Sequence, residues 1–211
     1  MSEHRGTHAD APFHTFRDGL TNDEIPASRL VGPGVIIDVR SQAELNPNYM
    51  LSVNDIKNYE RVNGRVPAGA IVMMNSGWGH RYPDPKRVFN TPDPADFPSY
   101  RFPGYDPQAV LFLARQRFIT ALGTDTPSID IGQSVNFAAH VVMGENQIVG
   151  LENVANVGDV PPRGSIIVIG LIKLKDGTGG PSRVIAIVDN SCQKTTGGNR
   201  RKSNRNTRRK P

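Results

Sequence analysis

The chain has 211 residues, of which 37% are hydrophobic and 21% charged, and this composition excludes an intrinsically disordered protein. Its length favours one domain. No apolar run is long enough to span a bilayer, no charged-then-apolar leader opens the chain, and the single cysteine, Cys192, excludes an internal disulfide. We therefore expect a cytoplasmic globular protein without a membrane partner.

The first half of the chain alternates between strand and helix patterns. β-Branched residues over 29–39, bounded by Gly and Pro, predict a buried strand. A helix is expected over 52–60, because Ser52 and Asp55 have the spacing of a capping pair. A second buried strand is expected over 70–74. Prolines then recur between residues 80 and 107, which predicts a long loop.

The second half contains one clear helix and several apolar strands. Asp106 and Pro107 predict a helix start, and the apolar spacing that follows indicates packing against a sheet. Strands are expected over 118–122, 165–174 and 183–188, the last two joined by a Gly-rich turn. This order predicts a mixed α/β fold whose apolar strands are covered on both faces.

Positive charge is concentrated at the C-terminal end. The segment 191–211 has no acidic residue and carries eight basic ones, which leaves the rest of the chain mildly acidic. Because it also lacks apolar side chains that could be buried, we expect a disordered tail over 191–211 and a folded domain over 1–190. Such a run can direct nuclear import or contact nucleic acid, or it can simply be solvated. A nucleic-acid partner is disfavoured by the acidic body.

Three of the five histidines lie close to the N-terminus, at His4, His8 and His14, with Asp10 between them. In an extended segment, residues 4, 6, 8 and 10 point the same way, and Gly6 leaves room between the two imidazoles. Two imidazoles and a carboxylate suit Zn²⁺ or Mn²⁺. The alternative is a frayed segment with incidental histidines.

Two further candidate ligands lie far along the chain, at His140 and Glu152. Each lies in a stretch with few charges. An acid among small and apolar residues is costly to bury unless it is paired or bound to a metal. Glu152 could therefore be a metal ligand or a hydrogen-bonded acid of the core.

The segment His4-Arg5-Gly6-Thr7-His8-Ala9-Asp10-Ala11-Pro12-Phe13-His14 has the pattern HxGTHxDxPxH. This signature resembles that of the cyclase-like metal-dependent hydrolases, a family that includes bacterial kynurenine formamidases and isatin hydrolases. The resemblance continues through 67–72, 76–78, 102–104, 123–130 and 151–156. It covers nearly the whole body, but not the basic tail.

The resemblance implies a swivelling β/β/α-type domain with a mixed central sheet, usually in a homodimer or higher oligomer. Family members carry further residues before the signature, so we expect this fold to lack an N-terminal strand. Carried over residue by residue, His14 is the catalytic acid/base, and Gln133 is a counterpart of the glutamine ligand in isatin-hydrolase-like members. The implied metal ligands are His4, His8, Asp10, His140 and Glu152.

The implied activity is hydrolysis of an amide-type C–N bond in a small molecule, either an arylformamide such as N-formylkynurenine or a cyclic amide such as isatin. Several other side chains could contact that substrate, although a purely structural role is the commoner one for each: Thr7, Phe13, Trp78, His80 and Ser128. Two alternatives stay open. One is an inactive family member that binds a metal or ligand as a scaffold. The other is a nuclear protein directed by its tail.

Overall fold

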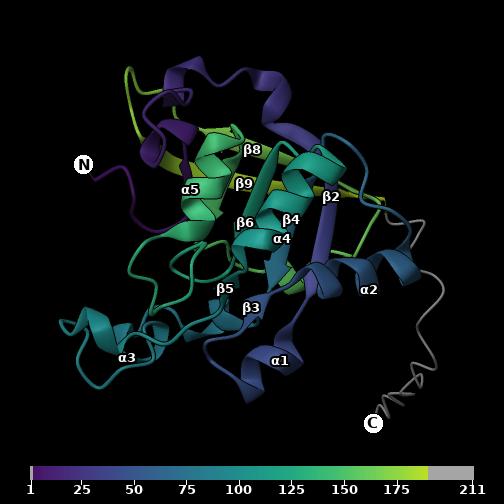
Figure 1. The fold of residues 1–211 in the computed structure, drawn as a ribbon. Helices are drawn as coiled ribbons and strands as arrows, with labels where there is room; N and C mark the ends of the chain where they lie inside the picture. The colour runs from purple at the N-terminus through teal and green to yellow at the C-terminus, as the bar shows by residue number, and fades with distance from the viewer. Residues whose placement is uncertain (1, 190–211) are drawn as a thin grey trace, which may run out of the picture.

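The computed structural model describes residues 2–189. Its centre is a closed mixed sheet in the order β1-β7-β6-β4-β2-β8-β9 (Figure 1). The expected boundary at 190 and 191, the basic tail and Cys192 lie outside the described residues. No helix among residues 2–189 is long and apolar enough to cross a membrane.

The strands vary from two to ten residues in length. They are β1 His8–Asp10, β2 Val31–Asp38, β3 Met50–Leu51, β4 Ile71–Asn75, β5 Gly104–Tyr105, β6 Ala121–Thr124, β7 Val149–Glu152, β8 Ser165–Leu171 and β9 Gly179–Val188. The α-helices are α1 Arg40–Leu45, α2 Val53–Asn63, α3 Pro85–Val88, α4 Pro107–Phe112 and α5 Ala138–Glu145. A π-helical turn over Leu113–Arg117 extends α4.

Parallel strands β2, β4, β6 and β7 form the buried half of the sheet. Their side chains alternate between two apolar cores, as the two-residue period of a strand requires. One core packs under α2, α4 and α5 and includes Val35, Val72 and Leu122. The other fills the inside of the sheet and includes Ile36 and Met73. The expectation that the apolar strands are covered on both faces is thereby confirmed for these four strands. It was wrong for β8 and β9, which expose Ile166, Ile185 and Ile187 on one face.

Antiparallel strands close the sheet. β8 pairs with both β2 and β9, and the short β1 lies between β7 and β9. β1 is therefore held on both edges although it has only three residues. This pairing fixes the part of the histidine-rich segment that forms β1 between β7 and β9.

The helix starts match their sequence signals. The Ser52 hydroxyl accepts from the Asp55 amide, and the Asp55 carboxylate accepts from the Ser52 amide at 2.7 Å, so the predicted capping pair is confirmed. Asp106 accepts from the Gln108 amide at the start of α4. The prolines between 80 and 107 leave only short elements, including α3 and β5.

Other expectations were wrong at their boundaries. The strand predicted over 118–122 begins only at Ala121, because Phe118 has a left-handed backbone (φ 56°) that ends the preceding turn. β9 begins at Gly179, inside the predicted turn, since its first residues pair with β1. The sheet is closed and mixed, while the swivelling arrangement stays a prediction.

Candidate metal centre

Neighbouring strands place three of the candidate side chains. In the antiparallel pair of β1 and β7, His8 lies directly opposite Glu152, and Asp10 follows two residues later on the same face of β1. All three side chains are buried. The Nε2 atom of His8 lies 3.3 Å from Asp10 Oδ1 and 3.3 Å from Glu152 Oε2.

His8 is held with its Nε2 atom facing the two carboxylates. Its Nδ1 lies 2.9 Å from the carbonyl oxygen of Gly6 and must donate to it, because a carbonyl only accepts. Nε2 is then the unprotonated nitrogen of the neutral ring. Gly6 contributes this carbonyl through a left-handed turn (φ 61°). The fully extended segment expected over residues 4–10 was therefore wrong before β1.

Helix α5 brings His140 to the same place. His140 Nε2 lies 3.0 Å from Glu152 Oε1 and 3.4 Å from Asp10 Oδ2. Its Nδ1 lies 2.6 Å from Asp130 Oδ2. A carboxylate behind a metal-binding imidazole fixes the ring and makes it a stronger ligand. Asp130 thus acts on the site through His140.

His4 reaches the cluster from outside the sheet. Its Nδ1 lies 2.7 Å from Asp10 Oδ1, and its Nε2 lies 2.8 Å from the hydroxyl of Thr178. That hydroxyl donates in turn to Glu3 Oε2. The ring of His14 stacks on His4 with centroids 4.1 Å apart and lies 6.0 Å from His140, but its side chain is exposed. All six predicted residues are therefore brought together.

The electrostatics favour a cation among these groups. Burial alone would lower the pKa of His8, but the carboxylates of Asp10 and Glu152 outweigh it and raise this pKa to about 10. Burial likewise opposes ionisation of Asp10, but the surrounding imidazoles, that of His140 first, hold its pKa well below the usual range. Desolvation at the edge of the cluster lowers the pKa of His14.

The donor atoms suit a divalent metal ion. His8 Nε2 and Asp10 Oδ2 are buried without a hydrogen-bond partner in the described chain, and such orphaned atoms are costly unless a ligand satisfies them. His4, His8 and Asp10 offer ligand atoms within 4.8 Å of one another. Imidazole and carboxylate groups are ligands of zinc and related ions. The residues present therefore fit a metal.

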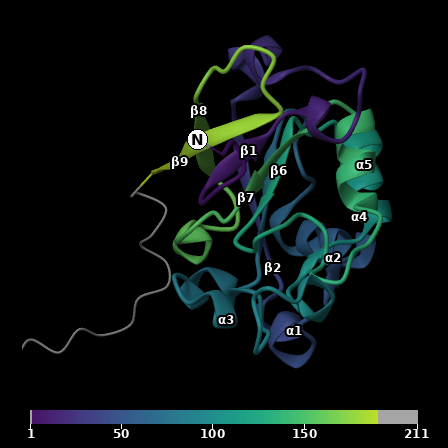
Figure 2. The same cartoon turned by 90° about the vertical axis from the view of Figure 1, so that its left-hand side faces the viewer.

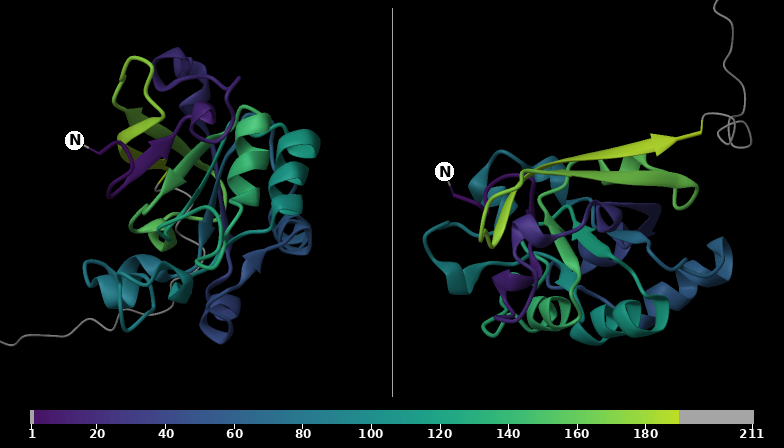
Figure 3. Two further views of the ribbon diagram at one scale, coloured as in Figure 1. Left: turned by 60° about the vertical axis from the view of Figure 1, so that its left-hand side comes forward. Right: turned by 90° about the horizontal axis from the view of Figure 1, so that it is seen from above.

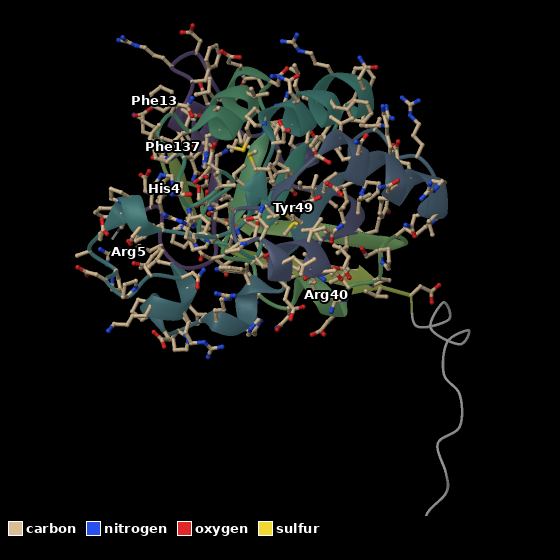
Figure 4. All side chains as sticks on the ribbon, turned by 60° about the horizontal axis from the view of Figure 1, so that its bottom comes forward. His4, Arg5, Phe13, Arg40, Tyr49 and Phe137 are labelled. Carbon is tan, nitrogen blue, oxygen red and sulfur yellow. The ribbon has the colours of Figure 1, made fainter. Side chains whose placement is uncertain are left out.

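A cavity of about 890 Å³ opens onto the cluster. His4, His14, His140 and Glu152 form its polar side, and Figure 4 shows His4 and Phe137 on the same side of the molecule. The rest of the wall is mainly apolar, and Phe89 and Tyr100 stack within it at 4.3 Å. Its aromatic lining residues are Phe89, Phe97, Tyr100, Phe102 and Phe137. This shape suits a flat apolar molecule whose polar end faces the histidines.

The sequence model of the Cyclase family matches residues 1–131. The chain belongs to this family. It is 31% identical over 197 residues to an isatin hydrolase of Roseibium aggregatum, which covers 89% of this chain and 73% of that protein. It is 28% identical over 186 residues to a kynurenine formamidase of Salinibacter ruber, with 88% and 76% covered.

Solved structures of the family share the fold. Isatin hydrolase A from Labrenzia aggregata, bound to benzyl benzoate, superposes with a TM-score of 0.82 at 36% identity, covering 89% of this chain and 74% of that one. A structure described as a potential metal-dependent hydrolase with cyclase activity has a TM-score of 0.67 at 23% identity, over 87% and 78% of the chains. The family resemblance inferred from the signature is confirmed.

The remaining candidate residues are divided between the main cavity and other parts of the structure. Gln133 lines the cavity, but its amide contacts Asn48 at 2.9 Å rather than the histidine cluster. Thr7 donates to the carbonyl of Asn153. Trp78 is buried and lines two other cavities, one of them with His80. Ser128 lines the main cavity, whereas Phe13 is not among the residues that line it.

Asp130 is the site residue that sequence reasoning missed. Besides His140 Nδ1, its carboxylate accepts from the amides of Ala139 and His140 at the start of α5. Ser134 donates to its Oδ1 at 3.1 Å. The signal in the sequence was the position of Asp130 at the end of segment 123–130, one of the segments that resemble the family. Its partner, His140, lies on α5, a helix that the sequence pattern did not reveal.

We expect Asp130→Asn to weaken metal binding about 10- to 100-fold, because an amide holds the His140 ring less firmly and does not strengthen its donor nitrogen. Competition with a chelator of known affinity measures this change. The matched control is Ser134→Ala, which removes a hydrogen bond to the other oxygen of Asp130 and should leave metal affinity nearly unchanged. Equal affinities for wild type and Asp130→Asn would contradict the positioning role.

Proposed function

We propose that the chain hydrolyses an amide-type C–N bond of an aromatic small molecule, with an arylformamide such as N-formylkynurenine and a cyclic amide such as isatin as the first candidates. The observation that carries this proposal is the cluster of predicted ligands beside an aromatic-lined cavity, whose wall includes His4, His14, His140 and Glu152. The named activities of the isatin hydrolase and kynurenine formamidase relatives support the same bond type.

The proposed metal ligands are His4, His8, Asp10, His140 and Glu152. We propose Zn²⁺ or Mn²⁺, because the set mixes imidazole nitrogens with carboxylate oxygens. When bound, such an ion supplies positive charge that acidifies water and polarises a carbonyl oxygen. The carboxylates of Asp10 and Glu152 balance part of that charge. The Gly6 carbonyl and Asp130 keep the rings of His8 and His140 oriented toward it.

The chain's own residues then bind the substrate and move the proton. The aromatic wall holds the ring of the substrate and excludes water from it. In the reaction the oxygen of a water molecule adds to the carbonyl carbon, the C–N bond breaks, and the nitrogen receives a proton. His14 faces this cavity and is proposed to take the proton from water and return it to the leaving nitrogen.

Metal removal tests this function directly. We expect chelator-treated protein to lose nearly all turnover of N-formylkynurenine or isatin, and added Zn²⁺ or Mn²⁺ to restore it, since the ligands remain in place. Product formation is measured by absorbance, with metal content followed in parallel. Full metal occupancy with no turnover of either amide would reject the proposed chemistry and favour the scaffold alternative.

We propose that this activity takes place in the reducing cytoplasm, because the chain has a single cysteine.

A further inference from the structure

The Gly-rich segment 177–181 lies against the first histidine of the metal cluster. It leads into β9, whose first residues pair with β1, so that Gly179 lies opposite Asp10. Figures 2 and 3 show this end of β9, in yellow-green, beside the purple N-terminal segment. The carbonyl of Thr178 also accepts from the Ala11 amide at 2.9 Å. The backbone of the segment is therefore fixed beside the strand that carries two of the proposed ligands.

Gly179 makes room for the ring of His4. A Cβ atom at this position would lie 2.7 Å from His4 Cε1 and 2.5 Å from the carbonyl oxygen of Ala9. A carbon at these distances would overlap both groups, and the Ala9 carbonyl belongs to the paired strand β1. The ring of His4 therefore packs on bare backbone, and its Nε2 lies 2.8 Å from the Thr178 hydroxyl.

The proton of the Thr178 hydroxyl is directed at Glu3. The hydroxyl oxygen lies 2.6 Å from Glu3 Oε2, and two oxygens this close need a proton between them. A carboxylate only accepts, so the hydroxyl donates this proton. Toward His4 the hydroxyl can then only accept. The Nε2 atom of His4 must therefore carry a hydrogen.

This hydrogen leaves the other nitrogen of His4 for the metal. In a neutral imidazole with a protonated Nε2, the Nδ1 atom is an acceptor. It lies 2.7 Å from Asp10 Oδ1, which is also an acceptor. Two acceptors at this distance need a cation to join them, which is a proton when no metal is bound. The Nδ1 atom of His4 is thus the one that a metal ion would take.

We propose that Thr178 is a positioning residue of the metal site, whose hydroxyl holds the His4 ring so that Nδ1 faces the metal. This inference rests on the proposed function, because it takes His4 as a metal ligand, but it does not depend on the substrate. His8 and His140 are held the opposite way round, with Nδ1 bonded to the chain and Nε2 facing the cluster. One imidazole of the site therefore binds through a different nitrogen from the other two.

The ring nitrogen that carries the hydrogen can be observed directly. Long-range ¹H–¹⁵N correlation spectra of the full Zn²⁺-loaded chain distinguish a protonated ring nitrogen from a metal-bound one, and His4→Gln assigns the His4 signals by their loss. We expect a protonated Nε2 and a metal-bound Nδ1 for His4, and the reverse for His8 and His140. A His4 ring bound through Nε2, or not bound at all, would overturn the proposal, and metal-bound His8 and His140 in the same spectrum would show that the proposed metal site itself stands.

Removal of the hydroxyl tests its effect on metal binding. Thr178→Val keeps the shape of the side chain but leaves the Nε2 hydrogen of His4 without an acceptor. Zn²⁺ affinity should therefore fall about 10- to 100-fold in competition with a chelator. Thr178→Ser restores the hydroxyl and should bind Zn²⁺ nearly as tightly as the wild type.

The control is Thr120→Val, a matched change just before β6. The Thr120 hydroxyl makes only long hydrogen bonds, of 3.3 and 3.5 Å, to the carbonyls of Gly69 and Ala70. This variant should leave Zn²⁺ affinity unchanged, and all variants should keep the wild-type melting temperature. Wild-type affinity in Thr178→Val, or an equal loss in Thr178→Ser, would overturn the role of the hydroxyl alone. A wild-type chain that binds no Zn²⁺ would overturn the proposed metal site as well.

Discussion

Replacing Asp10 with asparagine is expected to abolish metal binding and to reduce hydrolysis by at least ~10³-fold, because this carboxylate lies at the centre of the cluster. Its two oxygens lie within 3.4 Å of ring nitrogens of His4, His8 and His140. No other side chain of the cluster has close contacts to all three imidazoles among the described residues. Asparagine keeps the shape of the side chain and removes its charge.

Metal content and turnover measured on the same preparation check this expectation. The melting temperature separates loss of metal from loss of fold, since Asp10 is buried in β1. Asp18→Asn is the matched control, because Asp18 is an exposed acid nearby in the sequence. Normal metal content in folded Asp10→Asn protein would show that the metal is held elsewhere.

Replacing His14 with alanine is expected to lower kcat by about 10²- to 10⁴-fold while leaving metal content and KM close to wild type. This split follows from the position of His14. It is exposed on the cavity wall and stacked on His4, so it lies beside the proposed ligands and faces the cavity, with a ring nitrogen within 4.8 Å of ligand atoms of Asp10 and His140. A proton-transfer group acts on kcat, whereas a ligand would change metal affinity.

Steady-state kinetics at full metal loading measure the two parameters. His80→Ala is the control, because His80 lines a different cavity and should not affect the reaction. Loss of the metal from His14→Ala would make His14 a ligand. Unchanged kcat would remove it from the mechanism.

The local part of the site could be predicted from the sequence, and the distant part could not be derived from pattern alone. His4, His8, Asp10 and His14 lie within eleven residues, so short-range geometry already brings them near one another. His140 and Glu152 join them only because β7 pairs with β1 and α5 packs beside it. Their proposed roles came from the family resemblance, and the structure brings their side chains into the same cluster.

The missed elements have physical reasons. Helix α5 reads Ala-Ala-His-Val-Val-Met-Gly-Glu and has no clear apolar stripe, because its buried face includes His140 and Gly144 while Val141 lies on the exposed side. Without that helix, the partner of Asp130 could not be anticipated. β1 has only three residues and depends on β7 and β9 for its hydrogen bonds rather than on its own propensity. Tertiary pairing of this kind leaves little trace in a local sequence pattern.

Anomalous diffraction from crystals grown with Zn²⁺ or Mn²⁺ tests the central claim most directly. We expect a metal peak in contact with the imidazoles of His4, His8 and His140 and the carboxylates of Asp10 and Glu152, beside the aromatic cavity. A fully occupied peak at any other group of residues, with these five side chains not in contact with the metal, would contradict the account.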